Sequence, residues 1–435
     1  MIKRLFQWLD ASTCNVMAVE TIKSELNKAG FSEIKQSEKW DIKKGGKYYV
    51  IKNGTAIFAF VVGNKPISEQ GFRIISAHSD SPCFKIKPNA EIYGEGGVVS
   101  LNVEKYGGGI LYTWFDRPLS ISGRIVVKGD SDIYPQIIPV DLKNPIATIP
   151  HLAIHFNRAV NDGNPLSVQK DMKPVVGIFS KNEIEDFKSK GGLVRVLVAN
   201  HLNIKPEDII EYELNLYPVE KANFMGVHNE YFQSGRIDDL SMAFAALEAL
   251  LAVYNQEPEA TRVMAIFDNE ETGSGTKQGA ASPVLRDILE RVTKTITENY
   301  DNQDFYRAVA NSFMISADDA HGWHPNYNEK YDPTNHALLG GGPAIKINAN
   351  CKYMTDADGS AVFQNLCKRA GVKCQYFVNH SDVLGGSTLG NIFTGQMDIR
   401  GVDMGNPIWA MHSAKEMAAV SDHEDAIKVF TTFYK

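Results

Sequence analysis

Acidic and imidazole side chains gather in five short segments of the sequence, each where a predicted strand ends or a predicted helix begins. None of these segments is a nucleophile elbow or a glycine-rich loop of the kind that binds phosphate. Nitrogen and oxygen donors in such number suit divalent metals, and zinc in particular. The segments are His78-Ser79-Asp80, Asp238-Asp239, Asp268-Asn269-Glu270-Glu271, Asp318-Asp319 and His412-Ser413.

The donors are numerous enough for two cations. Two zinc ions a few Å apart need one shared carboxylate and about two further ligands each. Asp80 lies two residues beyond His78, so in an extended segment it can accept the second imidazole N–H. Glu270 is not needed as a ligand and is the candidate general base. The predicted ligands are His78, Glu271, Asp318, His412 and, as the bridge, Asp238.

Each segment has a simpler interpretation when it is taken alone. Asp238-Asp239 is also typical of a helix N-cap, and Glu270-Glu271 of a solvated turn. His412 alone is compatible with a hydrogen-bonded interior histidine. The coincidence of all the segments at strand ends or a helix start favours the metal site, because the carboxyl ends of strands bind ligands in open α/β sheets.

Three other histidines are weaker candidates. His380 begins a His-Ser-Asp tripeptide that repeats residues 78–80, and we interpret it as lining the pocket. For His321 and His324, a place at the rim of the metal site and a structural role remain equally open.

Strands and helices alternate in two parts of the chain and predict an α/β fold with a mostly parallel sheet between helix layers. Asn53-Gly54 predicts a type I′ hairpin between residues 47–51 and 56–61. Residues 120–127, 134–140 and 193–198 are predicted strands of a β-rich insertion. The predicted domains are residues 1–88 and 233–435, which form the catalytic domain, and the inserted residues 89–232. Further predicted strands are residues 72–77, 262–267, 313–317, 345–347, 376–378 and 408–411, and predicted helices are residues 14–27, 239–254, 284–296, 361–370, 413–420 and 425–433.

Composition narrows the class of protein. The 435 residues carry a formal charge of −7 and 43% hydrophobic residues, the balance of a soluble globular protein. No basic stripe favours nucleic acid, and no apolar run has the roughly 20 residues of a membrane span. The five cysteines lack CxxC spacing, which favours free thiols in a reducing cytoplasm.

The sequence resembles the aspartyl aminopeptidase family of dinuclear zinc exopeptidases. The matching motifs follow the family order along nearly the whole chain. They are SAHSDSPC (76–83), YGGG (106–109), WFDRPL (114–119), IPHLAIH (149–155), GRIDD (235–239), DNEETGS (268–274), SAD (316–318), HPNY (324–327), GPAIK (342–346) and AMHS (410–413).

This resemblance implies roles for individual residues. The first cation is expected on His78, Asp238 and Asp318, and the second on Asp238, Glu271 and His412. Glu270 is then the catalytic base of a metal-activated water. The implied substrates are peptides whose first residue is acidic.

The resemblance also implies two residues outside the ligand set and an assembly. Lys346 is expected to bind the acidic side chain; its alternative is a strand-end surface lysine. His155 is expected to reach a neighbouring subunit's active site and stabilise the oxyanion; its alternative is a buried histidine. The β-rich middle resembles a domain that builds twelve-subunit shells, so a homo-oligomer is expected.

Two other functions fit the same residues. One is a dimetal deacylase or carboxypeptidase-like hydrolase, since the same metals support other amide cleavages. The second is a shell or cargo protein without activity, which the intact ligand set argues against.

Overall fold

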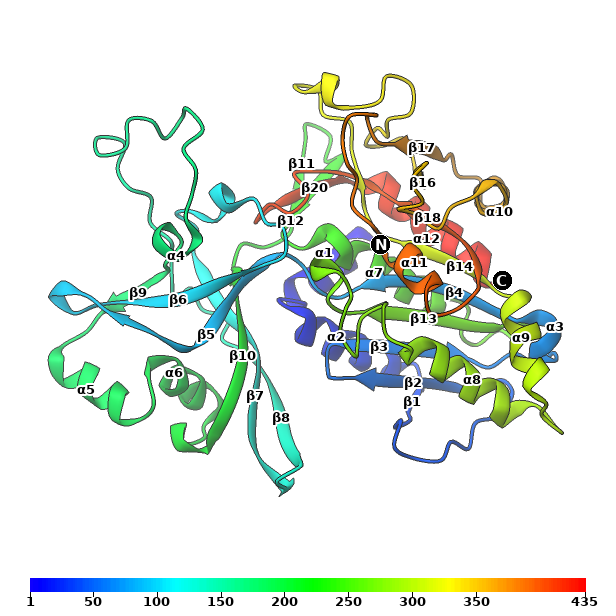
Figure 1. The fold of residues 1–435 in the computed structure, drawn as a ribbon, viewed down its shortest axis with the longest axis horizontal. Helices are drawn as coiled ribbons and strands as arrows, with labels where there is room; N and C mark the ends of the chain where they lie inside the picture. Colours follow the sequence, from blue (N-terminus) through cyan, green and yellow to red (C-terminus); the bar gives the residue numbers. More distant parts are fainter. The chain divides into compact units, whose positions relative to one another are not determined.

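A nine-stranded sheet forms the centre of the first of two units into which the chain divides (Figure 1). The structure is a computed structural model and describes residues 1–435. The central strands β13, β4, β14 and β18 run parallel, and antiparallel pairs flank them, which confirms the predicted α/β class. In sheet order the strands are β1 (Ser32–Glu33), β2 (Lys47–Lys52), β3 (Ala56–Val61), β13 (Thr261–Phe267), β4 (Phe72–His78), β14 (Phe313–Ala317), β18 (Arg400–Gly405), β16 (Ala344–Ile347) and β17 (Gln375–Val378).

Alternating side chains of these strands build a separate core on each face of the sheet. In β3, Ile57 and Ala59 join one core whereas Phe58 and Phe60 join the other, as the two-residue period of a strand requires. Both faces are therefore covered, which explains why the central strands are almost wholly apolar. One core includes α1 (Ile2–Ala11), α2 (Asn15–Lys28), α7 (Ile237–Val253), α10 (Ala357–Ala370) and α12 (Val420–Tyr434), and the other α3 (Ile67–Gln70), α8 (Val284–Ile296), α9 (Asn302–Ala310) and α11 (Leu389–Thr394).

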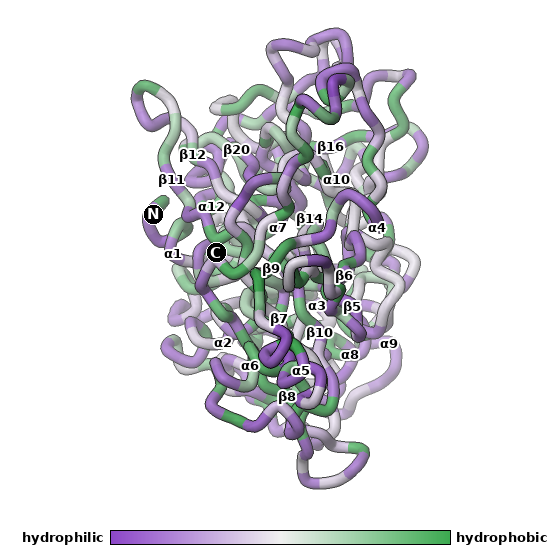
Figure 2. The backbone as a smooth tube through the Cα atoms, turned by 90° about the vertical axis from the view of Figure 1, so that its left-hand side faces the viewer, coloured by the Kyte–Doolittle hydropathy of each residue, from purple (hydrophilic) through white to green (hydrophobic).

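A six-stranded antiparallel sheet organises the second unit, which comprises residues 81–221 and 412–415. The helix α6 (Leu193–Leu202) packs on β5, and α5 (Lys181–Ser189) is mostly hydrophilic (Figure 2). In sheet order the strands are β8 (Tyr134–Asp141), β7 (Leu119–Ser131), β10 (Ile209–Pro218), β5 (Cys83–Tyr93), β6 (Val98–Tyr106) and β9 (Val175–Ile178).

The predicted strand over residues 193–198 is wrong, because this segment is the helix α6. Its valines favour a strand by local propensity. However, Val194 and Val198 are buried and lie four residues apart, so they share one helix face. Asn203 then ends the helix in the left-handed conformation, with a φ of 56°.

The predicted helix over residues 413–420 is also wrong. Its second half is β20 (Glu416–Ala419), which pairs with β12 (Tyr231–Ser234) and β19 (Pro407–Trp409). Pairing with two neighbours outweighs the helix propensity of Glu, Met and Ala. The strand predicted over residues 408–411 is β19, which ends at Trp409. With β12, β20, β11 (Asn223–Met225) and β15 (Ala320–His321) it forms a separate five-stranded sheet, so His412 does not follow a strand of the nine-stranded sheet.

Every helix of the structure is too short or too polar to cross a lipid bilayer.

Candidate active site

Three neighbouring parallel strands end beside one another and carry acidic or imidazole groups. His78 is the last residue of β4 and pairs with Phe267, the last residue of β13. Asp318 follows β14, which pairs with the other side of β4. Because parallel strands present their carboxyl ends at the same edge of a sheet, these segments meet in space.

One group of possible metal ligands lies at this edge. The ligand atoms of His78, Asp238, Asp239 and Asp318 all lie within 4.8 Å of one another, and those of His78, Glu270 and Glu271 form a second such group. His78 Nε2 is 3.4 Å from Asp238 Oδ1 and 3.9 Å from Glu270 Oε2. The structure thus brings together the predicted donors of the first unit.

Asp80 connects the imidazole with the loop that carries the two glutamates. Its Oδ1 lies 3.3 Å from His78 Nδ1, on the side of the ring opposite Asp238. The same carboxylate accepts hydrogen bonds from the backbone N–H groups of Glu270, at 3.1 Å, and Glu271, at 3.2 Å. One buried side chain therefore orients both the imidazole and the loop.

Asp239 and Asp319 are residues of the site that sequence reasoning missed. Asp239 is fully buried and accepts hydrogen bonds from the backbone N–H of His78, at 3.0 Å, and of Asp319, at 3.3 Å. Both Asp239 oxygens thus accept from chain segments outside α7 (Ile237–Val253), and the interpretation of the pair as a helix cap does not account for these contacts. The repeated Asp-Asp doublet, at 238–239 and 318–319, was the available signal.

The loop after β13 directs its glutamates inward. Asn269 begins the turn in the left-handed conformation, with a φ of 61°, which Asn tolerates better than most residues. The short helix η4 (Glu270–Thr272) follows, and the Glu270 side chain is only 14% exposed. The alternative of a solvated acidic turn is therefore wrong.

Burial and mutual repulsion of these acids raise their pKa values. Burial first, and Asp318 next, raise the pKa of Glu270 to about 8. Burial also raises the pKa values of Asp239, Glu271 and Asp319 well above their usual range, and neighbouring carboxylates add to this effect. For His78, burial alone lowers the pKa, but the adjacent Asp239, Asp238 and Asp80 raise it well above the usual value.

This crowding fits bound divalent cations. Buried carboxylates without sufficient positive charge are unfavourable, and one Asp319 oxygen, Oδ1, is buried without a hydrogen-bond donor. An imidazole among carboxylates is a donor set that zinc accepts. Lys346 supplies one positive charge, since its Nζ lies 3.5 Å from Asp318 Oδ1. It is only 4% exposed, so the alternative of a surface lysine is wrong.

The remaining predicted residues belong to other parts of the chain. His412 belongs to the 412–415 segment of the second unit, where its Nδ1 is 3.3 Å from the carbonyl of Gly108; its role as a ligand stays a prediction. His155 is exposed, so the alternative of a buried histidine is wrong. His380 and His321 join no group of possible metal ligands.

The comparison with known families decides between the interpretations. Residues 8–434 match the family described as Aminopeptidase I zinc metalloprotease (M18). The chain belongs to the M18 family of zinc aminopeptidases. The M18 chain is 49% identical over 418 residues to a probable M18 family aminopeptidase 2 of Clostridium novyi, and the match covers 96% of this chain and 94% of the relative.

Solved structures agree with this assignment. The chain superimposes on a cryo-EM structure of the Ape4 and Nbr1 complex with a TM-score of 0.94 and 33% identity, covering 99% of this chain and 84% of that chain. A structure of the S. cerevisiae mApe1 dodecamer gives a TM-score of 0.86 at 26% identity, covering 99% and 95%. The predicted family and the predicted zinc-dependent exopeptidase class are confirmed. The alternatives of a deacylase or carboxypeptidase-like hydrolase, and of a shell or cargo protein without activity, are therefore set aside.

The raised pKa values predict how stability depends on pH. Carboxyls with raised pKa values bind more protons in the folded than in the unfolded state, so metal-stripped protein should become less stable as the pH rises from about 5 to about 8. Differential scanning fluorimetry measures this as a falling Tm. Added zinc should remove most of the decline, because the cations bind the ionised acids. A stripped protein whose Tm rises over the same range contradicts the account.

Proposed function

We propose that this M18 aminopeptidase uses two divalent cations, zinc in the native enzyme, and prefers peptides that begin with an acidic residue. The observation that carries the metal proposal is the buried group of one imidazole and several carboxylates with raised pKa values. His78, Asp238 and Asp318 would hold one cation. Asp238, Glu271 and His412 would hold the other. Met411, which directly precedes His412 in the chain, is the last residue of the Ala222–Met411 segment of the first unit.

The cations, when bound, supply Lewis acidity that polarises the peptide carbonyl and lowers the pKa of an attacking water. Glu270 accepts the proton of this water and delivers it to the departing nitrogen. Its carboxylate fits the task, because it faces His78 Nε2 at 3.9 Å yet keeps 14% of its surface exposed. Asp80 acts as a positioning residue, since it accepts hydrogen bonds from both backbone N–H groups of the glutamate pair.

The preference for acidic first residues rests on Lys346. Its ammonium is buried on β16, beside Asp318 and 5.8 Å from the centre of the Tyr353 ring. Asp318 keeps the pKa of Lys346 above its usual value against the opposing effect of burial. A permanently charged donor at the edge of the ligand cluster would pair with a carboxylate of the substrate's first side chain.

An exposed apolar loop in the second unit and the assembly of a related protein support the proposal that this chain forms a homo-oligomer. The exposed side chains of Leu152, Ile154 and Phe156 flank His155 on one loop, and an apolar group of this kind is typical of an association surface. The mApe1 relative is a dodecamer. We infer that this chain assembles likewise, acts in the cytoplasm, and uses His155 to stabilise the oxyanion in a neighbouring subunit's site.

Replacing the proposed base tests the chemistry. Glu270→Gln removes the proton acceptor but keeps the shape of the side chain, so kcat should fall by roughly 10²–10⁴-fold. Zinc content, measured by atomic emission on the same preparation, should stay unchanged. Glu257→Gln, in an exposed loop, is the matched control and should keep full activity. Near-normal turnover in Glu270→Gln would remove this residue as the base.

Replacing Lys346 tests the specificity separately. Lys346→Met keeps most of the side-chain volume but loses the charge. We expect kcat/KM for an Asp-peptide to fall about a hundredfold, because the carboxylate of the substrate's first side chain would be buried without a positively charged partner. A Leu-peptide should change by less than about threefold. The exposed Lys373→Met serves as the control. Equal losses for both peptides would reject the proposed acidic preference while leaving the metal chemistry intact.

A further inference from the structure

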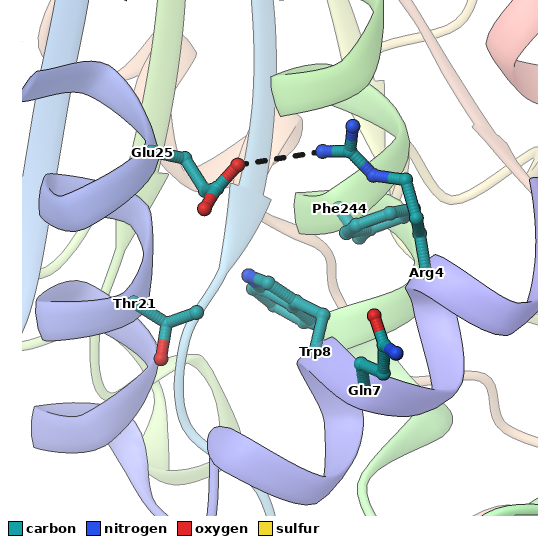
Figure 3. Close-up of a pocket in the computed structure, with 6 residues that line it drawn as sticks. All are labelled: Arg4, Gln7, Trp8, Thr21, Glu25 and Phe244. Carbon is teal, nitrogen blue, oxygen red and sulfur yellow. Dashed lines mark hydrogen bonds and ion pairs between the residues drawn. The ribbon is translucent and has the colours of Figure 1, made fainter. Parts of the chain in front are cut away.

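A cavity away from the ligand cluster lies in the first unit between helices α1, α2 and α7 (Figure 3). Its volume is about 390 Å³, which falls within the range of small-molecule sites. The helix α7 carries Phe244 to this cavity, more than one helical turn beyond Asp239. The lining residues are Arg4, Gln7, Trp8, Thr21, Glu25 and Phe244.

A buried hydrogen-bond donor points into this cavity. Trp8 is only 4% exposed, and its ring packs 5.5 Å from that of Phe244. Its Nε1 is buried and has no acceptor in the protein. Figure 3 shows this nitrogen directed toward the space between Thr21 and Glu25. Because indole N–H groups are donors only and buried donors usually have a partner, the cavity offers a place for an acceptor atom.

Charges of both signs flank this donor. Arg4 Nη2 lies 2.7 Å from Glu248 Oε1 but 3.4 Å from Glu25 Oε2. Lys28 Nζ contacts the other Glu25 oxygen, Oε1, at 2.6 Å, so Glu25 Oε2 is the oxygen that has only a long contact. The Arg4 side chain is 54% exposed, so a ligand can reach it. Glu25 and Glu248 would repel a ligand that carries only a negative charge, and Arg4 would repel a ligand that carries only a positive charge. A small zwitterion satisfies both, since its two charges can take the places of Arg4 and Glu25 in their mutual contact.

We propose that this cavity binds a free α-amino acid with an apolar side chain. The ligand's carboxylate accepts hydrogen bonds from Trp8 Nε1 and Arg4, and its ammonium donates to Glu25. The rings of Trp8 and Phe244 contact the side chain. Free amino acids are what an aminopeptidase releases, so the site would sense the product class of the enzyme. The inference does not rest on the acidic preference or on the number of cations.

Equilibrium dialysis of the zinc-loaded enzyme against radiolabelled L-leucine tests the proposal. The wild-type protein should bind leucine saturably, and Trp8→Phe, which removes only the N–H, and Glu25→Gln should each weaken binding about tenfold. Glu20→Gln removes a carboxylate from the same helix outside the cavity and should bind as wild type does. N-acetyl-L-leucine lacks the ammonium and L-leucinol lacks the carboxylate, so neither should compete.

Activity provides the second readout. The three variants should keep the wild-type kcat/KM, because none touches the cluster around His78. A loss of leucine binding at unchanged kcat/KM would support the cavity as the site. Leucine binding of equal affinity in wild type, Trp8→Phe and Glu25→Gln would overturn the proposal, because the ligand would then occupy another site such as the active site. Absence of any saturable binding would overturn it as well.

Discussion

The crowding of buried carboxylates at one edge of the nine-stranded sheet is the constraint on which the site depends. Asp238, Asp239, Asp318 and Asp319 are each at most 8% exposed, and they share this edge with Glu270 and Glu271. Such a group is unfavourable in a protein interior unless positive charge compensates it. The single buried ammonium of Lys346 is too little for so many acids, which explains why divalent cations fit here.

The fold provides the means to hold this unfavourable group in place. Parallel strands β13, β4 and β14 bring three chain segments to one edge, and the cores on both faces keep the strands fixed. The carboxylates of Asp80 and Asp239 then accept hydrogen bonds from backbone N–H groups of neighbouring segments. These bonds fix the directions of His78 and of the glutamate loop, and such fixed polar groups are what catalysis by preorganisation requires.

Much of this arrangement could be predicted from the sequence, because both the strand pattern and the polar residues that follow the strands are local signals. The helix at 284–296 and the strand at 313–317 occupy the residues predicted for them. The helix α6 and the strand β20 could not be predicted from local preference, since packing on β5 and pairing with β12 decide them. The role of Asp239 was also hidden, because its partners His78 and Asp319 are about 80 or more residues away.

X-ray diffraction from crystals of the zinc-loaded enzyme, recorded on both sides of the zinc absorption edge, tests the central claim most directly. The account predicts two anomalous peaks per chain, about 3.5–4 Å apart, with a carboxylate oxygen of Asp238 bound to each. A single peak, or a pair of peaks away from His78 and Asp318, would contradict it.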